Sequence, residues 1–185
     1  MIYCLPHRAT PPTGAAVVDT TSRAIGWSRG LSPFFLGPVD LYGERAEIVE
    51  NAWQFSKVYA EHYDGQFLSS YWTWRARGFA DRRAHRYPMG RGRKPLFTLL
   101  HDQKLGYVEA RRQLYIPIYA EAVSKTEAFA KLRELARQGD LVLQDFDAYD
   151  HRAREMSWHD VINNTHMKMG HAFVLAMMLE GWIFP

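Results

Sequence analysis

Four polar residues recur at helical spacing in the first third of the chain: Glu50, Gln54, Lys57 and Glu61. At 3.6 residues per turn they fall on one line of a helix, opposite an apolar face. A carboxylate in such a line can stabilise positive charge that develops on a sugar ring, or it can activate a water molecule. A solvated helix surface gives the same pattern, so Glu50 is a candidate catalytic residue with a plain structural alternative.

A second group of carboxylates follows the apolar run Leu141–Leu143, which predicts a buried strand. Loops at strand ends often present functional groups, and neighbouring carboxylates influence one another's protonation. Asp145 and Asp147 are therefore candidates for positioning a water molecule or a sugar hydroxyl, with an ordinary acidic turn as the alternative. The spacing of the acidic residues and of the eight histidines fits neither a calcium loop nor a metal-binding pair, so we expect no metal site.

The positive charge of the chain is concentrated in residues 75–94. This segment has eight Lys and Arg side chains against one Asp, a net charge of +7, whereas the whole chain carries +3. Its glycine-rich part lacks the ending of a P-loop. Arginine side chains and free amides can still bind phosphate, so Arg91, Arg93 and Lys94 are candidate phosphate ligands. Nucleic acid is the alternative partner of this segment.

Residues before and within the polar helix also form a distinctive order: Ser32, Pro33, Phe34, Phe35, Pro38, Gly43, Glu50, Gln54 and Lys57. This order resembles the opening of the NADAR family, the NAD- and ADP-ribose-associated, N-glycosidase-like proteins. Asn51 and Pro33 stand where that family has a histidine and an asparagine. The resemblance extends over residues 31–179, and its specific part is residues 31–57.

The resemblance implies an N-glycosidase that hydrolyses an ADP-ribose-type or related nucleotide conjugate without a metal or organic cofactor. Glu50 would be the catalytic carboxylate, assisted by Asp147 or Asp145. The implied and candidate ligand contacts are Phe35, Trp53, Gln54, Lys57, Trp72, Arg91, Arg93, Lys94 and Asn164. Two alternatives stay open. The first is a nucleic-acid-binding or base-modification protein that uses residues 75–94, and the second is a nucleotide or ADP-ribose sensor without turnover.

These residues must be positioned by an α+β fold, mainly helical, with about six helices and a few short strands in a single domain. A chain of 185 residues with 47% hydrophobic content can bury a core of its own. Residues 1–30 are expected to be a strand and loop segment of the same domain, and residues 31–185 its NADAR-like part.

Helices are predicted over about residues 45–62, over 103–122 with an interruption at Pro117, from the cap at 124–127 to Gly139, from Ser157 to about 164, and over 167–181. Residues 15–19 are predicted to form a short strand. The long segment between the first two helices carries no helix prediction.

The composition also bears on the cellular setting. The single Cys4 lies near an N-terminus that we expect to be mobile, and it excludes a disulfide framework. No apolar run reaches the length of a membrane span, and no apolar leader is evident. We therefore expect a soluble protein of the reducing cytoplasm, with no membrane partner.

Overall fold

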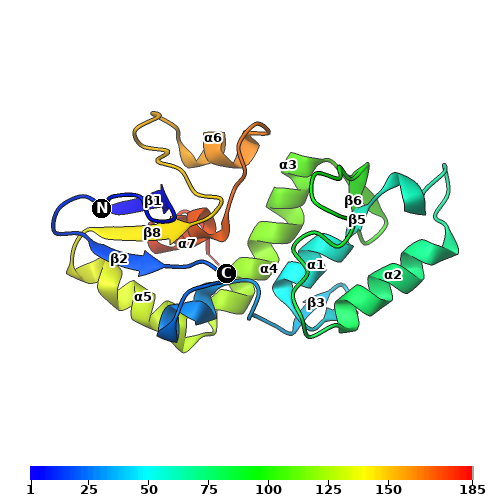
Figure 1. The fold of residues 1–185 in the computed structure, drawn as a ribbon, viewed down its shortest axis with the longest axis horizontal. Coiled ribbons are helices and arrows are strands. Elements are labelled where there is room, and N and C mark those ends of the chain that lie inside the picture. Colours follow the sequence, from blue (N-terminus) through cyan, green and yellow to red (C-terminus); the bar gives the residue numbers. More distant parts are fainter. Residues whose placement is uncertain (185) are drawn as a thin grey trace.

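The buried strand expected at Leu141–Leu143 is the centre of a parallel sheet. In the computed structural model, which describes residues 1–184, β8 (Leu141–Asp145) pairs with β1 (Ile2–Pro6) on one side and β2 (Ala16–Asp19) on the other. All five residues of β8 are buried, as in parallel strands covered on both faces. The carboxyl ends of the three strands therefore lie at one edge of the sheet (Figure 1).

The N-terminal segment contributes two of these three strands, which corrects the expectation of a mobile terminus. Cys4 is only 1% exposed, and its thiol donates a hydrogen bond to the carbonyl of Ala172 at 3.4 Å. The backbone of β1 is held along its whole length by β8. The short strand expected at residues 15–19 is confirmed as β2.

Helices of the same half close over the sheet. α7 (His171–Leu179) packs against β1 and β8 with eight of its nine residues buried, as its nearly continuous apolar sequence predicts. The other helices of this half are η1 (Gly26–Leu31), α5 (Glu127–Gln138) and α6 (Trp158–Asn163). The Ser157 side chain caps α6 in a capping box with Asp160, as expected, whereas α5 is capped by Thr126 alone and the capping box expected over residues 124–127 does not form.

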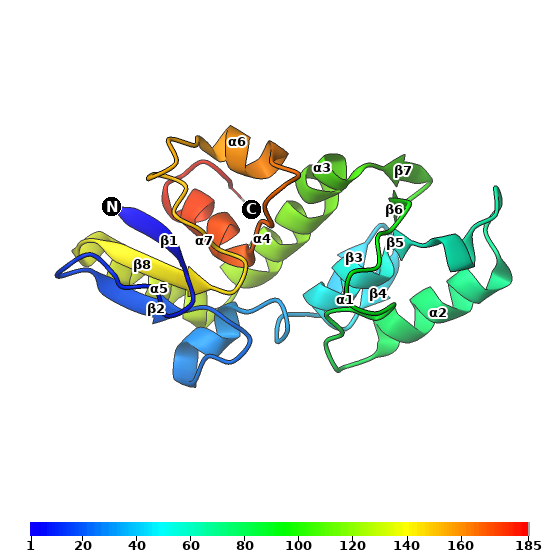
Figure 2. The same ribbon diagram turned by 45° about the horizontal axis from the view of Figure 1, so that its top comes forward.

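The other half of the molecule holds two small antiparallel sheets and two α-helices (Figure 2). Phe55 of the first helix lies against Gly78 of the second, where a Cβ atom would come within 2.0 Å of the Phe55 ring. Gly78 therefore lets the two helices approach closely. The elements are β3 (Val39–Leu41), β4 (Glu44–Ala46), α1 (Val49–Phe55), β5 (Lys57–Val58), η2 (Ala60–His62), α2 (Ser69–Ala80), β6 (Phe97–Leu100) and β7 (Gln103–Leu105).

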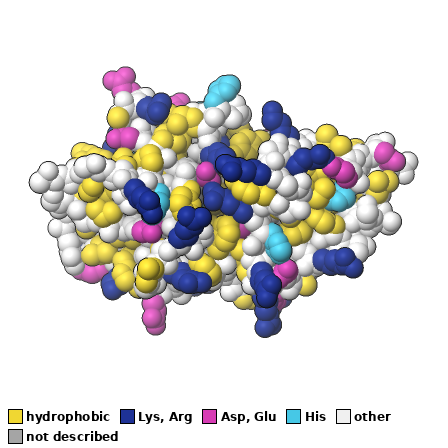
Figure 3. Space-filling model, viewed as in Figure 1, with side chains coloured by type: hydrophobic (Ala, Val, Ile, Leu, Met, Phe, Trp, Pro, Cys, Tyr) yellow, Lys and Arg dark blue, Asp and Glu magenta, His cyan; other side chains and the backbone are white. Residues whose placement is uncertain are grey.

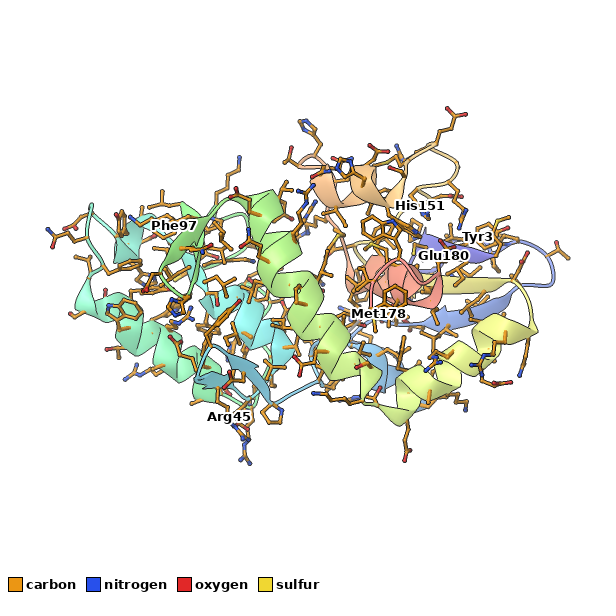
Figure 4. All side chains as sticks on the ribbon, turned by 180° about the vertical axis from the view of Figure 1, so that it is seen from behind. Tyr3, Arg45, Phe97, His151, Met178 and Glu180 are labelled. Atoms are coloured by element: carbon orange, nitrogen blue, oxygen red, sulfur yellow. The ribbon has the colours of Figure 1, made fainter. Side chains whose placement is uncertain are left out.

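One continuous helical segment runs between the two halves. It consists of α3 (Tyr107–Ala110), the π-helical stretch η3 (Arg111–Tyr115) and α4 (Ile116–Ser124). Seen from behind, the same division places Phe97 in one half and Met178 in the other (Figure 4). The interruption expected at Pro117 lies earlier in the segment: the π stretch ends at Tyr115, and Pro117 is the second residue of α4, where the first turn tolerates a proline.

The predicted helix over residues 45–62 is much shorter in the structure. Only Val49–Phe55 is α-helical, and all seven of its residues are buried. The preceding residues pair in the β3–β4 hairpin, whose turn places Tyr42 and Gly43 at positive φ. The residues after the helix pair with β6 instead. Tertiary pairing on both sides therefore limits α1 to two turns.

Two other helix boundaries differ from the sequence prediction, and one helix was not predicted. The helix expected over 103–122 begins at Tyr107, because residues 103–105 pair with β6. The last helix begins at His171 and not at 167. α2 was not predicted, and it places the start of the basic segment on a helix.

The expected α+β class is confirmed: 40% of the structure is helix and 17% is strand, in one domain with three small sheets. Over residues 1–184, no helix is both long and apolar enough to cross a membrane.

Candidate functional site

A cavity of about 170 Å³ lies where the two halves meet the central helical segment. One side is formed by α1 and by residues 32–34, which precede β3. The other side is formed by the carboxyl end of β8 and by Lys168, Met169 and His171. Residues of η3 line the space between them. Lys and Arg side chains gather across the middle of the face that Figure 3 shows, together with a few Asp and Glu side chains. The cavity lies beyond the carboxyl ends of parallel strands, a common location for ligand sites.

Residues far apart in the sequence meet in this cavity. Its lining includes both Glu50 and the pair Asp145 and Asp147, from opposite sides. It also includes three of the predicted ligand contacts, namely Trp53, Gln54 and Lys57. The expectation that Glu50, Phe35 and a residue of 145–147 converge on one cleft therefore agrees with the geometry for Glu50 and residues 145–147, and not for Phe35.

Three of these side chains form a hydrogen-bonded chain, which we call the inner wall: Glu50, Gln54 and Lys57. The Gln54 amide donates to the Glu50 carboxylate at 2.8 Å, and its amide oxygen accepts a hydrogen bond from the Lys57 ammonium at 2.7 Å. Glu50 and Gln54 are 6% and 7% exposed. Three members of the polar line seen in the sequence thus face the cavity, whereas the fourth, Glu61, lies in η2 and is exposed.

Burial shifts the protonation of both charged members of the inner wall. Desolvation raises the pKa of Glu50, against the opposing effects of the Gln54 hydrogen bond and the Lys57 charge. Desolvation also lowers the pKa of Lys57 to about 8, against the opposing effect of Glu50. The Lys57 ammonium additionally lies 4.5 Å from the centre of the Trp53 ring. The inner wall therefore holds two ionisable groups that are poorly solvated and only indirectly connected.

Asp145 and His171 form a second buried pair at the edge of the sheet. The His171 Nε2 atom lies 2.6 Å from the Thr20 carbonyl oxygen, which can only accept, so Nε2 carries a hydrogen. The Nδ1 atom lies 3.2 Å from Asp145 Oδ2. Within residues 1–184 this carboxylate oxygen makes no other polar contact, although Asp145 is only 4% exposed.

A third group of charges, which we call the rim, consists of Arg86, Asp147 and Lys168. Arg86 donates to the Asp147 carboxylate at 2.8 Å, and the Lys168 ammonium lies 3.3 Å from its other oxygen. The side chains are 34%, 28% and 62% exposed in that order. Burial acts to lower the pKa of Lys168, but the Asp147 charge and the Tyr87 hydroxyl outweigh it and raise that pKa.

Aromatic side chains supply much of the remaining surface. Trp53 packs on Tyr115 with ring centroids 5.2 Å apart, and Phe34 and Tyr107 also line the cavity. Burial raises the pKa of Tyr115 well above its usual value, and the nearby carboxylate of Glu50 acts in the same direction. Tyr115 is therefore a neutral hydroxyl that can donate or accept a hydrogen bond in the cavity.

Arg111 fixes the loop that carries the rim lysine. It is 1% exposed and donates to the carbonyls of Ile162, Asn164 and Met167 and to the Tyr107 hydroxyl, at 2.6–3.0 Å. Both Arg111 and Tyr115 lie in the π-helical stretch and line the cavity. Such stretches are frequent at functional sites, because they redirect side chains out of the α-helical pattern.

The comparison with protein families gives one match, which covers residues 7–159: the family of unknown function DUF6939. The chain belongs to DUF6939. No curated protein and no solved structure matches it. The DUF6939 match includes α1, the basic segment and the end of β8, and it stops before Lys168 and His171.

Three predicted contacts do not line the cavity of this DUF6939 protein. Phe35 is 44% exposed and packs on Arg29, while its neighbour Phe34 faces the cavity instead. Trp72 is 47% exposed on the outer side of α2. The Asn164 side-chain oxygen accepts hydrogen bonds from the backbone amides of His166 and Met167, and so it shapes the loop.

The candidate phosphate ligands Arg91, Arg93 and Lys94 also lie outside the cavity lining. All three are exposed, and Arg93 pairs with Glu61. Four of the eight cations of the basic segment are paired with carboxylates, through Arg75–Glu44, Arg82–Glu47, Arg86–Asp147 and Arg93–Glu61. The free positive charge of residues 75–94 is thus much smaller than the sequence suggests.

Several residues that line the cavity carry no distinguishing signal in the sequence: Arg86, Tyr87, Tyr107, Arg111, Tyr115, Lys168 and His171. Arg86 belongs to the basic segment, where nothing separates it from its neighbours. His171 lies in the apolar helix α7; it is buried and hydrogen-bonded, and it also borders the cavity. Within the described residues, no cluster of three or more His, Cys, Asp or Glu side chains is arranged to hold a metal ion.

Proposed function

We propose that the protein is an N-glycosidase-like hydrolase that cleaves the N-glycosidic bond of an ADP-ribose-type or related nucleotide conjugate. The observation that carries the proposal is the meeting of Glu50 with Asp145 in one small cavity with aromatic walls. The resemblance of residues 31–57 to the NADAR family supports the same reaction. Three residues of this segment, Ser32, Pro33 and Phe34, line the cavity.

In this reaction Glu50 is the catalytic carboxylate. Cleavage of the bond places positive charge on the sugar ring, and water must replace the departing base. A carboxylate in a poorly solvated site stabilises this charge strongly and accepts a proton readily, because water does not compete with it. The inner wall keeps Glu50 oriented through Gln54, with the Lys57 charge one hydrogen bond further away.

Asp145 is better suited than Asp147 to contact the sugar. Its buried Oδ2 lies 3.2 Å from His171 Nδ1 and makes no other polar contact within residues 1–184, so it can accept a further hydrogen bond from a sugar hydroxyl. Asp147 is already bound by two cations at the rim. In this assignment Trp53, Tyr115 and Phe34 surround the ring that enters.

The test compares two glutamates of the same predicted polar line. Base release from ADP-ribosylated and nucleoside substrates is measured by chromatography for the wild type, Glu50→Gln and the exposed control Glu61→Gln. Glu50→Gln should lower turnover by about 10²-fold or more while affinity changes little, because the amide keeps the shape and loses the charge. Glu61→Gln should behave as the wild type.

Other outcomes lead to different assignments. Weaker binding by Glu50→Gln with full turnover at saturation would assign Glu50 to binding alone. Binding by the wild type without base release from any substrate of the panel would favour the sensor. Affinity for nucleic acid that falls steeply with salt would favour the basic-segment alternative, although its internal ion pairs argue against that.

A further inference from the structure

The rim holds more positive charge than its single carboxylate neutralises. Arg86 and Lys168 both approach Asp147, one at each carboxylate oxygen. Lys168 also donates to the Tyr87 hydroxyl at 3.4 Å. The three charged groups sum to one positive charge at the entrance to a cavity that they all line.

The two cations reach this point from different halves of the molecule. Arg86 belongs to the loop after α2, and Lys168 to the loop before α7 that Arg111 fixes from behind. Both remain accessible, with 34% and 62% of their side chains exposed. An arginine fork and a lysine on opposite sides of one small anion are suited to the several oxygens of a phosphate group.

The size of the cavity places the charged part of a ligand at this rim. A volume of about 170 Å³ is below the 300–1,000 Å³ that is typical of sites for whole drug-sized ligands. It accommodates a single sugar or base ring. Any phosphate attached to that ring must then lie at the entrance, beside Arg86 and Lys168.

We propose that Arg86 and Lys168 form a binding site for a phosphate ester, which the Asp147 carboxylate occupies in the free protein and leaves when a ligand phosphate enters. Through this site the cavity would select phosphorylated sugars over neutral nucleosides. The identity of the ring in the cavity rests on the proposed function, whereas the phosphate site itself does not.

Other cations near the cavity are less suitable. Arg111 is committed to three carbonyls and a hydroxyl, and Lys57 lies within the inner wall beside Gln54. Arg91 and Lys94 are exposed and do not line the cavity. The last two therefore serve as matched controls for an arginine and a lysine of the same chain.

The test measures binding without turnover. Calorimetry with inorganic phosphate, ribose 5-phosphate and ribose is carried out on the wild type and five variants. Arg86→Gln and Lys168→Gln should each weaken binding of both phosphates by about fivefold or more. Asp147→Asn should strengthen it by about threefold or more, because a competing negative charge is removed. Arg91→Gln and Lys94→Gln should stay within about twofold of the wild type.

Thermal unfolding of each variant confirms that the fold is kept. The proposal is overturned if Asp147→Asn weakens phosphate binding as Arg86→Gln does, since Asp147 would then position the cations. It is also overturned if the Arg91 and Lys94 controls lose as much affinity as the rim variants. Phosphate binding without base release would support the phosphate site and reject the glycosidase. Base release from neutral nucleosides as fast as from phosphorylated ones would support the glycosidase and reject the selection of phosphorylated ligands by the rim.

Discussion

The inner wall and the rim are two charged regions of one cavity with opposite surroundings. Glu50 and Lys57 of the inner wall are connected only through the Gln54 amide, and both are withdrawn from water. Arg86, Asp147 and Lys168 of the rim contact one another directly and remain partly exposed. The charged groups are thus poorly solvated and not in direct contact where the cavity is closed, and they are partly solvated and in direct contact where it opens.

The two lysines show what this difference means. Burial lowers the pKa of Lys57 to about 8, whereas the Asp147 charge raises the pKa of Lys168 against the effect of burial. Buried groups such as Lys57 are suited to reactions in which charge develops, because little water surrounds them to compensate a change of protonation. Groups such as Lys168 are suited to holding a permanent anion. This difference supports the proposal that the inner wall carries the chemistry and the rim the recognition of phosphate.

The largest effect should come from the buried arginine that supports the cavity from behind. Arg111→Gln leaves the carbonyls of Ile162, Asn164 and Met167 without their charged donor. We expect the free energy of unfolding to fall by about 3–5 kcal/mol. The matched rim variant Arg86→Gln removes a partly exposed ion pair and should cost about 1 kcal/mol or less.

Denaturant unfolding followed by tryptophan fluorescence measures both changes. Equal losses for Arg111→Gln and Arg86→Gln would contradict the distinction between a buried support and an accessible rim. A loss confined to Arg86→Gln would reverse it.

The second effect is a rise of the free energy of unfolding between pH 8 and 10.5, which we expect from Lys57 of the inner wall and not from Lys168 of the rim. Below pH 8 Lys57 is protonated in both the folded and the unfolded chain, so folding must desolvate its charge. Between pH 8 and 10.5 the unfolded chain binds the proton and the folded one does not, so stability rises with pH. The shift from 10.5 to about 8 corresponds to about 3 kcal/mol.

Lys57→Met removes this titration. The difference in the free energy of unfolding between wild type and variant should therefore move in favour of the wild type by about 3 kcal/mol across this window. Lys168→Met is the control, because a raised pKa puts its titration above 10.5, where the wild type loses stability instead. A flat difference for Lys57→Met would mean that its ammonium is well solvated.

Local patterns predicted the parts of the fold and site that depend on neighbouring residues. The strand expected at residues 141–143, the cap at Ser157 and the group of Glu50, Gln54 and Lys57 each follow from neighbouring residues of one segment. Pairing between distant segments was not available in the sequence. For this reason α1 was predicted too long, and the carboxylate partners of residues 75–94 remained unseen.

The same reason explains the residues of the rim. Arg86 looks like the other arginines of its segment, and only its meeting with Asp147 and Lys168, which lie 61 and more positions later, distinguishes it. His171 was visible only as an apolar-helix histidine, because its contacts with Thr20 and Asp145 cross most of the chain.

The smallest effect concerns Gly170, which lies beside Asp145 and the backbone of Asp147. A Cβ atom there would come within 2.1 Å of Asp145 Oδ2 and 3.1 Å of the Asp147 carbonyl oxygen. Gly170→Ala should therefore displace the buried Asp145 carboxylate, and we expect a loss of about 1–3 kcal/mol in the free energy of unfolding. Gly139→Ala is the control, since a Cβ atom at Gly139 meets nothing within 4 Å.

Ligand binding by Gly170→Ala then separates the two regions. The three atoms nearest the added Cβ belong to the Asp145 carboxyl group and the Asp147 backbone carbonyl, and not to the Asp147 carboxylate or its two cations. Calorimetry should therefore show inorganic phosphate binding within about twofold of the wild type, while turnover or sugar binding falls by about tenfold. If phosphate binding falls together with sugar binding, the inner and outer parts of the cavity are one coupled unit, and the division between them fails.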